Sequence, residues 1–578
     1  MNPQPQILIL DAGGQYCHLI ARKVRDLGVY AEVRASESAA AELCSAKGII
    51  ISGGPNSVYD AGSPTVDPAI FASRPAVLGI CYGQQLMAHL LGGDVRKGEK
   101  GEFGLAALEV NDSSDPLFGG LGGRQQVWMS HRDLVAGVPE GFSIAGRTET
   151  CAVAAMANPA RRLYSVQFHP EVVHTTRGKE LLANFVFRVC GCEKDWDARH
   201  RAPLIEEEIR QCAGARNVFF FVSGGVDSTV AFALCTRALG ENRVRGVYVD
   251  TGLMREGETD FVRRMPGISV ECAEEQFLTA LAGVTDPEQK RHFIGEEFVR
   301  VQERVIESRR LLDEHWILGQ GTIYPDTIES GGTAKAALIK THHNRVAGIQ
   351  KLIEAGRIVE PLKSFYKDEV REIGRELGLP AELLDRHPFP GPGLAIRCLC
   401  SAFDAEVRQT PEGWVIPVHS VGVQGDSRSY APVLAIRELD HTRATELINQ
   451  LSGVNRVIAL VKSQAALTAM QVRACSLTQE RLARLRAADA TVRRLSHEAG
   501  FDHQVWQFPV VLIPLGTAPA PDSIVLRPIH SVDGMTAQSV TMEPPLLEKM
   551  TAELLAQPGI AAVFYDLTHK PPATIEWE

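Results

Sequence analysis

The stretch VFFFVSGGVDSTVAFALCTRA, residues 218–238, decides how the middle of this chain folds. Its five leading apolar residues, 218–222, predict a strand too apolar to face water, and the SGGVDS loop follows at once. Thr229 then opens a run with the apolar spacing of a helix. The stretch therefore predicts a strand, a glycine turn and a helix N-terminus.

A turn of this kind exposes backbone N–H groups to an anion. Gly224 and Gly225 let the chain turn without a Cβ in the way, and they let an anion come close. The hydroxyls of Ser223, Ser228 and Thr229 add donors, and the helix dipole favours negative charge at this end. The pattern predicts a phosphate-binding loop, whereas a plain Gly-Gly turn in an α/β fold is the alternative interpretation.

The loop lacks the Gly-Lys-Ser/Thr ending of a Walker A motif, so the usual lysine at the phosphates is missing. Asp227 instead places a carboxylate beside the phosphates, which predicts a Mg²⁺ ion between them. SGGVDS resembles the loop of ATP pyrophosphatases, enzymes that split ATP into AMP and pyrophosphate. The ATP-binding residues that we expect are Ser223, Gly224, Gly225, Val226, Asp227, Ser228, Thr229 and, farther along the chain, Lys340.

Length and composition limit the possible classes of protein. A chain of 578 residues predicts two to four domains, and a net charge of −10 argues against nucleic acid as the main partner. No apolar run reaches the roughly 18 residues of a membrane span, and the first residues do not have the pattern of a signal peptide. The lack of an apolar span predicts no membrane partner, and twelve cysteines without metal-ligand or disulfide spacing indicate a reduced, cytoplasmic protein.

The first third of the chain predicts a βαβ fold with a reactive cysteine. Ile7–Leu10 and Gly48–Ile51 have the pattern of buried parallel strands, with a helix over His18–Leu27 between them. In residues 77–91, VLGICYGQQLMAHLL, a strand passes into a helix at Cys81, which stands between two glycines. A cysteine at such a turn has the form of a nucleophile elbow, although a buried cysteine is more often a small core residue.

A base for this thiol is found in SVQFHPE, residues 165–171. In an extended segment residues i and i+2 point the same way, so His169 and Glu171 can align toward Cys81. These segments, with ISGGPNSVYD at 51–60, resemble the class I glutamine amidotransferases. The resemblance implies that Cys81 attacks glutamine, His169 transfers the proton and Glu171 orients the imidazole. It also implies an oxyanion hole of backbone N–H groups near Gly53, Gly54 and Tyr82.

In other segments of the middle third, a predicted strand is followed by polar residues. RGVYVD (245–250) runs into TGLMR, and GQGTIYPDTIES (319–330) is a similar strand-to-loop segment. The stretch 331–346 mixes glycine with Lys340 and two histidines, and we interpret it as a lid over ATP or as a solvated loop. RHPFPGPGLAIR (386–397) predicts a rigid lining for a purine pocket, with a simple hinge as the alternative.

The last third contains two weakly similar copies of one unit. HSVGVQGDSRSY (419–430) is echoed by HSVDGMTAQSV (530–540), and ELINQLSGVNRVIAL (446–460) by ELLAQPGIAAVFYDL (553–567). Each copy predicts a strand, a helix ending at a glycine and a returning strand. The chain ends THKPPATIEWE, which has prolines and a tryptophan where a frayed tail would be polar.

Nine motifs in order resemble the glutamine-hydrolysing GMP synthetase family, in its longer type with an extended C-terminal domain. They are GICYGQQ, SGGVDS, DTGLMR, GTIYPDTIES, KTHHN, RHPFPGPGLAIR, GVQGDSRSY, DGMTA and KPPATIEWE. The resemblance implies an α/β chain of three domains: a class I amidotransferase (1–198), an ATP pyrophosphatase with a parallel sheet (199–397) and an α+β C-terminal domain with a duplicated unit (398–578).

The resemblance also implies a ligase that makes GMP from XMP, ATP and glutamine through an adenylated XMP, with Mg²⁺ and without an organic cofactor. The XMP-binding positions would be Arg255, Asp426, Arg428, Gln507, Lys570 and Glu576. A duplicated C-terminal unit predicts a monomer with an internal pseudo-dimer, and a homodimer is the alternative. The rival functions are a glutamine-dependent NAD synthetase and a catalytically dead nucleotide-binding regulator.

Overall fold

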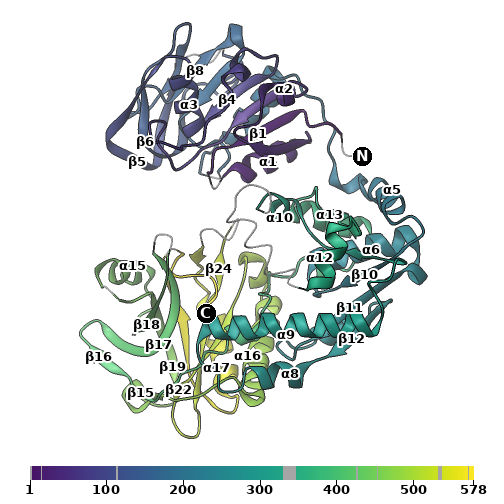
Figure 1. The fold of residues 1–578 in the computed structure, drawn as a ribbon. Helices are drawn as coiled ribbons and strands as arrows, with labels where there is room; N and C mark the ends of the chain where they lie inside the picture. The colour runs from purple at the N-terminus through teal and green to yellow at the C-terminus, as the bar shows by residue number, and fades with distance from the viewer. Residues whose placement is uncertain are drawn as a thin grey trace. The chain divides into compact units, whose positions relative to one another are not determined.

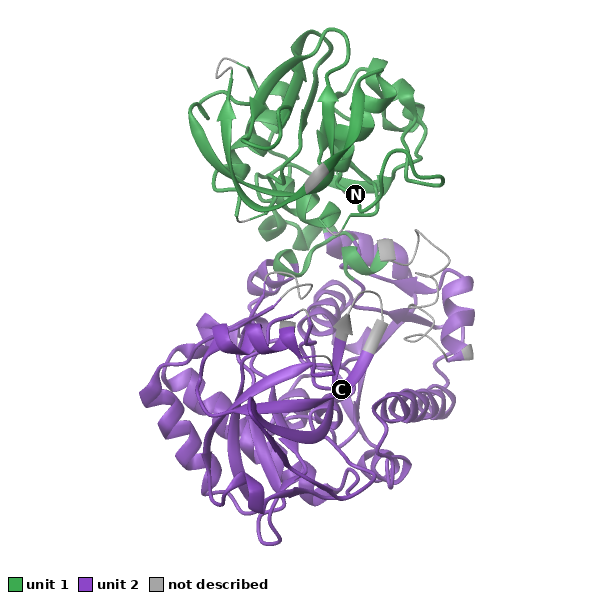
Figure 2. Ribbon diagram, turned by 90° about the vertical axis from the view of Figure 1, so that its left-hand side faces the viewer, with its two compact units in different colours: residues 1–204, 323–337, 364–369 green, residues 205–322, 338–363, 370–578 purple. Residues whose placement is uncertain are grey.

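The structure is a computed structural model that describes residues 3–14, 16–111, 115–172, 174–329, 346–424, 427–451, 453–531, 537–570 and 572–578. The chain divides into two compact units, coloured green and purple in Figure 2. Unit 1 contains residues 1–204, 323–337 and 364–369, and unit 2 contains residues 205–322, 338–363 and 370–578. The three domains expected from the sequence, with boundaries after 198 and 397, stay a prediction.

Unit 1 is built on a nine-stranded sheet in the order β2-β1-β3-β4-β9-β8-β7-β5-β6. Strands β2, β1, β3, β4 and β9 are parallel, and the remaining pairs are antiparallel. The strands are β1 Ile7–Asp11, β2 Ala31–Ala35, β3 Gly48–Ile51, β4 Ala76–Ile80, β5 Asp94–Val110, β6 Arg124–Gly137, β7 Ser143–Arg147, β8 Ala155–Asn158 and β9 Leu163–Val166. The main helices are α1 Cys17–Arg25, α2 Ala40–Leu43, α3 Tyr82–Leu90 and α4 Gly178–Ala183.

The alternation of apolar side chains along β1 gives the sheet two buried faces. Ile7 and Ile9 belong to a core with α1 and α4, whereas Leu8 and Leu10 belong to a core with α2 and α3. The expected βαβ pattern needs one correction, because α1 leads into β2 and not directly into β3. Strand β2 reads AEVRA and lies at the edge of the sheet, so its sequence lacks the continuous apolar run of a central strand.

Unit 2 contains a five-stranded, fully parallel sheet in the order β12-β11-β10-β13-β14. Its strands are β10 Asn217–Phe221, β11 Val244–Asp250, β12 Ile268–Cys272, β13 Trp316–Gly319 and β14 Ile358–Val359. The helices between residues 202 and 384 are α5 Ala202–Ala213, α6 Val226–Leu239, α7 Glu258–Arg263, α8 Glu274–Ala280, α9 Pro287–Ser308, α10 Tyr324–Glu329, α12 Ala347–Glu354, α13 Lys367–Glu376 and α14 Ala381–Leu384. Of these, α10 belongs to unit 1, and α5 and α13 each begin in unit 1 and continue in unit 2. Residues 222–225 form the predicted turn after β10, and α6 begins at Val226, three residues before the start expected at Thr229 (Figure 1).

A second sheet of unit 2 has seven strands in the order β16-β17-β18-β19-β26-β23-β21. They are β16 Arg408–Thr410, β17 Gly413–Gln424, β18 Ser427–Ile436, β19 Arg456–Ser463, β21 Val510–Ile513, β23 Asp522–Leu526 and β26 Ile560–Asp566. Helices α15 His441–Gln450, α16 Gln479–Glu498 and α17 Pro544–Leu555 contribute to one core on this sheet. In two small sheets, β20 Gln471–Val472 pairs with β15 Ala405–Glu406 and β22 Leu515–Gly516, and β24 Ile529–His530 pairs with β25 Gln538–Ser539.

The seven-stranded sheet contains the predicted duplication. In each copy a strand pairs in parallel with the strand after a helix: β18-α15-β19 in the first and β23-α17-β26 in the second. The two copies meet at the antiparallel pair of β19 and β26, as two-fold symmetry requires. The two HSV segments do not correspond, however, because His419 lies in the strand before β18 and His530 lies after β23.

The C-terminal end is buried. Trp577 is fully buried and its indole N–H donates to Asp566 Oδ2 at 3.0 Å. The same carboxylate oxygen pairs with Arg456 at 2.8 Å and with Arg527 at 2.7 Å. Burial raises the pKa of Asp566, but the two guanidinium groups outweigh this effect and lower the pKa below its ordinary value. The tail therefore belongs to the core of unit 2.

The helices in the described part of the chain are all too short or too polar to cross a membrane. All twelve cysteines are described and all are free thiols.

Candidate functional site

The turn between β4 and α3 presents Cys81. This residue has φ of 53°, a backbone conformation that costs energy for a non-glycine residue and is typical of a nucleophile elbow. Glycines flank it because the strand, the helix and β3 are too close for a side chain. A Cβ at Gly83 would lie 2.4 Å from the carbonyl oxygen of Ile51, and one at Gly79 would lie 2.5 Å from that of Gly83.

His169 and Glu171 lie in the segment that follows β9, and both are buried. His169 Nδ1 donates to Glu171 Oε1 at 2.7 Å, and the imidazole is also hydrogen-bonded to Cys81. Burial alone lowers the pKa of His169, but the charges of Glu171 and Cys81 outweigh it and raise this pKa well above its ordinary value. The structure thus brings the three predicted residues into one line of thiol, imidazole and carboxylate.

Two further groups touch the thiol and were not singled out in the sequence. Cys81 Sγ lies 3.6 Å from the carbonyl oxygen of Ser130 in β6, and Gln167 Nε2 lies 3.6 Å from the same sulfur. Gln167 precedes His169 by two residues, so the extended pattern of SVQFHPE could have identified it. Ser130 comes from a long antiparallel strand, and no local pattern marks it.

The expected oxyanion segment lies against this line of residues. A Cβ on Gly53 would lie 3.1 Å from His169 Cε1 and 3.5 Å from Cys81 Cβ, so only a glycine keeps this space open. A Cβ on Gly54 would lie 2.4 Å from the carbonyl oxygen of Ala12. Tyr82 is the first residue of α3, where backbone N–H groups have no acceptor within the helix. These positions can offer N–H groups to an anion beside the thiol.

The SGGVDS loop of unit 2 joins β10 to α6 as expected. Gly224 has φ of +78°, a left-handed conformation that favours glycine, and Gly225 is the residue before the first turn of α6. The hydroxyls of Ser223 and Ser228 are 3.0 Å apart, and the N–H of Gly225 donates to Ser223 Oγ at 3.2 Å. The hydroxyls are therefore held on the side of the loop where the N–H groups of the helix begin.

Neighbouring segments support this loop. Arg386 donates to the carbonyl oxygen of Gly224 at 3.4 Å and forms an ion pair with Glu258. Asp227 lies in the first turn of α6, and one of its carboxylate oxygens is buried. A carboxylate oxygen is a ligand that suits Mg²⁺, so the residues present fit such an ion. Lys340 lies outside the described residues.

Three of the predicted XMP-binding residues lie in one polar cluster of unit 2. Arg397 donates two hydrogen bonds to Glu576, at 2.8 and 2.7 Å. Gln507 Nε2 donates to Glu576 Oε1 at 3.2 Å and to the carbonyl oxygen of Pro388 at 2.8 Å. Burial raises the pKa of Glu576, but Arg397 outweighs burial and lowers the pKa below its ordinary value. Glu576 is therefore an ionised acceptor.

Arg255 completes this cluster. Its guanidinium lies 4.2 Å from the centre of the Phe389 ring and 3.5 Å from Asp489. Burial lowers the pKa of Arg255 to about 10, although Asp489 raises it. Arg397 also faces the Phe389 ring, at 5.2 Å. An aromatic ring flanked by two guanidinium groups offers both a stacking surface and positive charge.

For the other three predicted XMP-binding residues, the structure gives mainly the backbone position or no position. Lys570 is half-buried, and its backbone pairs with Ala537 through bonds of 2.7 and 3.2 Å. The backbone of Arg428 lies in β18 opposite Val423. Asp426 lies outside the described residues.

Sequence reasoning missed Arg397, Phe389 and Asp489 as individual residues. Two of them belong to RHPFPGPGLAIR, which was expected to line a purine pocket, but the pattern did not indicate which side chains would turn inward. Asp489 is fully buried in α16, and an acidic residue on the apolar side of a helix is the signal that could have identified it.

Three protein families match successive parts of the chain. Glutamine amidotransferase class-I matches residues 8–189, NAD synthase matches residues 198–262, and GMP synthase C terminal domain matches residues 495–577. The first match contains the line of Cys81, His169 and Glu171, and the second contains the SGGVDS loop.

Relatives that align with nearly the whole chain share one description. The probable GMP synthase [glutamine-hydrolyzing] of Leptospira interrogans is 41% identical, with 99% of each chain covered. The GMP synthase [glutamine-hydrolyzing] of Carboxydothermus hydrogenoformans is also 41% identical, with 99% of each covered, and that of Geobacillus kaustophilus is 39% identical, with 100% of each covered. Among solved structures, a glutamine amidotransferase from Thermotoga maritima is 17% identical over 33% of this chain and 100% of its own, with a TM-score of 0.28.

Proposed function

Because the chain belongs to the glutamine-hydrolysing GMP synthase family, it is a carbon–nitrogen ligase of guanine nucleotide biosynthesis, and we propose which residues perform each step. The reaction converts XMP, ATP, glutamine and water to GMP, AMP, diphosphate and glutamate. It proceeds by hydrolysis of glutamine at a cysteine and by adenylation of XMP.

In the proposed glutaminase step, Cys81 attacks the side-chain amide of glutamine. The line of Cys81, His169 and Glu171, with 2.7 Å between His169 and Glu171, is the observation that supports this role most strongly. His169 takes the thiol proton and gives it to the departing ammonia, which leaves a glutamyl thioester on Cys81. Water then hydrolyses this thioester to glutamate and the free thiol, and Glu171 keeps the imidazole oriented throughout. Backbone N–H groups near Gly53, Gly54 and Tyr82 stabilise the negative oxygen of the tetrahedral intermediate.

In the proposed adenylation step, the loop of residues 223–229 binds the phosphates of ATP. Its glycines and hydroxyls, and the N-terminus of α6, offer donors to the anion. Mg²⁺ would be held by Asp227 and by phosphate oxygens, and it would neutralise charge on the departing diphosphate. Lys340 is proposed as a further phosphate contact.

XMP is proposed to bind at the cluster around Phe389 in unit 2. Arg255, Gln507 and Glu576 supply a cation, an amide and a carboxylate, which suit the phosphate, carbonyl and N–H groups of a purine nucleotide. Lys570, Arg428 and Asp426 remain proposed contacts on the strength of the family resemblance.

The duplicated seven-stranded sheet supports a proposal about assembly. Its two copies already form an antiparallel pair through β19 and β26, so we propose a monomer with an internal pseudo-dimer. Light scattering of the purified protein measures this directly, and a mass of two chains would favour the homodimer. We place the protein in the cytoplasm because all twelve cysteines are free.

The experiment that tests the glutaminase assignment is Cys81→Ala. We expect this variant to lose glutamine-dependent GMP formation and to keep GMP formation from added ammonium. A variant that still used glutamine would contradict the assignment. The NAD synthase match covers the SGGVDS loop, so deamido-NAD in place of XMP is the control substrate, and we expect no product from it.

A further inference from the structure

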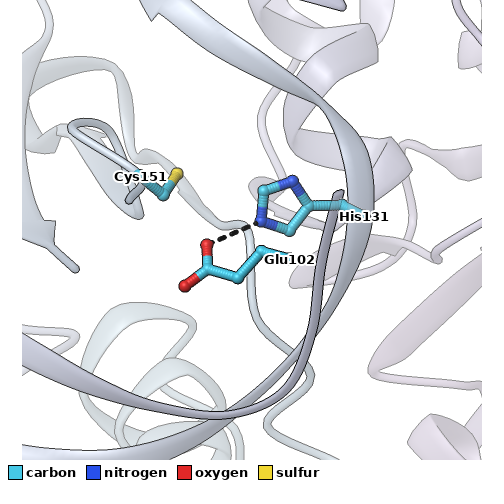
Figure 3. A group of neighbouring side chains, drawn as sticks. All are labelled: Glu102, His131 and Cys151. Carbon is cyan, nitrogen blue, oxygen red and sulfur yellow. Dashed lines mark hydrogen bonds and ion pairs between the residues drawn. The ribbon is translucent and has the colours of Figure 1, made fainter. Parts of the chain in front are cut away.

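Three side chains of unit 1 that the synthase reaction does not use face one another (Figure 3). Glu102 comes from β5, His131 comes from β6, and Cys151 lies in the turn before β8. A carboxylate oxygen, a ring nitrogen and the sulfur all lie within 4.8 Å of one another. Within the described residues this is the one group of its kind.

The backbone places these residues together. Glu102 and His131 are direct cross-strand partners, and the pairing of β5 with β6 shifts register between Lys97 and Glu102. His131 and Cys151 are buried. The cluster is therefore built by the strands themselves rather than by surface side chains that meet by chance.

The hydrogen bonds of His131 indicate what the cluster needs. His131 Nδ1 lies 3.0 Å from the carbonyl oxygen of Asp133, which can only accept, so Nδ1 carries a proton. Nε2 lies 3.2 Å from Glu102 Oε2, which is also an acceptor. A neutral imidazole would direct a lone pair at a carboxylate, so either a proton or a metal ion has to lie between the two atoms.

Supporting contacts resemble those around metal ligands in other proteins. A ligating histidine usually donates its second N–H to a backbone carbonyl, as His131 does to Asp133. The Thr148 hydroxyl donates to the other oxygen of Glu102 at 3.2 Å and accepts from the N–H of Cys151 at 3.0 Å. Thr148 thereby links two of the three candidate ligands.

We propose that Glu102, His131 and Cys151 bind a divalent cation of the zinc class, with water as the fourth ligand. A sulfur, an imidazole nitrogen and a carboxylate oxygen form a donor set that suits Zn²⁺ and excludes Mg²⁺ and Ca²⁺. The nitrogen and oxygen are already 3.2 Å apart, and the sulfur lies within 4.8 Å of both, so it has to move by at most about 1 Å for tetrahedral coordination. On binding, the Cys151 thiol releases its proton to solvent.

A metal ion here ties three segments together beside the glutaminase line. Ser130, the neighbour of His131, has its carbonyl oxygen 3.6 Å from Cys81 Sγ. Binding of the metal therefore restrains the strand that contacts the thiol. The cation stabilises unit 1 and holds Ser130 in place, and it takes no part in the chemistry of glutamine.

The test uses the full chain with Cys81→Ala, which prevents the glutaminase thiol from binding metal. Metal is removed with a chelator, and Co²⁺ is then added as a spectroscopic probe for Zn²⁺. We expect one ion per chain, a thiolate-to-cobalt charge-transfer band, and loss of the band when Zn²⁺ is added. Adding Cys151→Ser should remove the band, whereas Cys235→Ser, which changes another buried thiol, should leave it.

Two results overturn the proposal. A protein that shows no charge-transfer band does not bind metal through a thiolate, and the charge between His131 and Glu102 is then a proton. A band that survives Cys151→Ser comes from another thiol. A second test does not depend on the cysteine. Zn²⁺ that binds the folded protein should raise its melting temperature, and Glu102→Gln should weaken Zn²⁺ binding and remove this rise.

Discussion

Gly53→Ala is expected to impair glutamine hydrolysis although it replaces none of the reacting side chains. Its backbone conformation is open to alanine, because φ at this position is not left-handed. The new methyl group would lie 3.1 Å from His169 Cε1 and 3.5 Å from Cys81 Cβ. The first distance is shorter than an ordinary carbon contact, which begins near 3.4 Å, so the imidazole has to move by about 0.3 Å.

The imidazole has little freedom to move. Its Nδ1 is hydrogen-bonded to Glu171 at 2.7 Å, and the backbone N–H of His169 donates to the carbonyl oxygen of Trp128 at 3.0 Å. The methyl group also fills the space beside the proposed oxyanion position. Misplacing a reacting group by 1 Å can cost about a hundredfold in rate, so a shift of about 0.3 Å predicts a loss of about fourfold, or ~0.8 kcal/mol of transition-state stabilisation.

The assay compares GMP formation from glutamine with GMP formation from ammonium in the same preparation. We expect only the glutamine-dependent kcat/KM to fall. Gly295→Ala is a matched control, since this glycine lies within α9, a Cβ there meets nothing within 4 Å, and alanine favours a helix. A Gly53→Ala variant with an unchanged glutamine rate would refute the packing argument, and an equal loss with ammonium would point to misfolding.

Three further changes test other parts of the account. Glu171→Gln removes the carboxylate that raises the pKa of His169, so the imidazolium should lose its proton at a lower pH. The alkaline limb of the glutaminase pH profile should therefore shift to lower pH, and an unshifted limb would exclude His169 as its source. Lys290→Met leaves Glu578 buried without its partner at 2.5 Å, which should cost about 3–5 kcal/mol of unfolding free energy in urea, and Glu578→Gln in the same chain should recover part of it. Gly224→Ala requires alanine at φ of +78°, so calorimetry should find weaker ATP binding, and undiminished binding would argue against the loop as the phosphate site.

The parts of the fold that could be predicted depend on local chemistry. The strand, turn and helix around SGGVDS were predictable because a buried apolar strand, two glycines and a largely buried apolar helix follow one another without interruption. The same holds for the turn at Cys81, where glycines mark a close approach of strand and helix. Edge strand β2 was missed because it is only half buried, so its sequence resembles a loop.

The site could be predicted where its residues share a motif and not where tertiary packing assembles it. His169 and Glu171 are two residues apart, so the extended pattern was enough to align them. The partners of Glu576 and Arg255 come from distant segments, and no local pattern indicates that Arg397 reaches Glu576. The cluster of Glu102, His131 and Cys151 was not predictable for the same reason, because its members meet only after β5 and β6 pair.

The most direct test of the central claim is a product analysis with XMP, ATP and glutamine supplied together. In the proposed reaction, the thiol of unit 1 releases ammonia from glutamine, and the loop of unit 2 binds the ATP that activates XMP. We predict that GMP, AMP, diphosphate and glutamate form in equal amounts. Formation of ADP in place of AMP, or unchanged XMP with all co-substrates present, would contradict it.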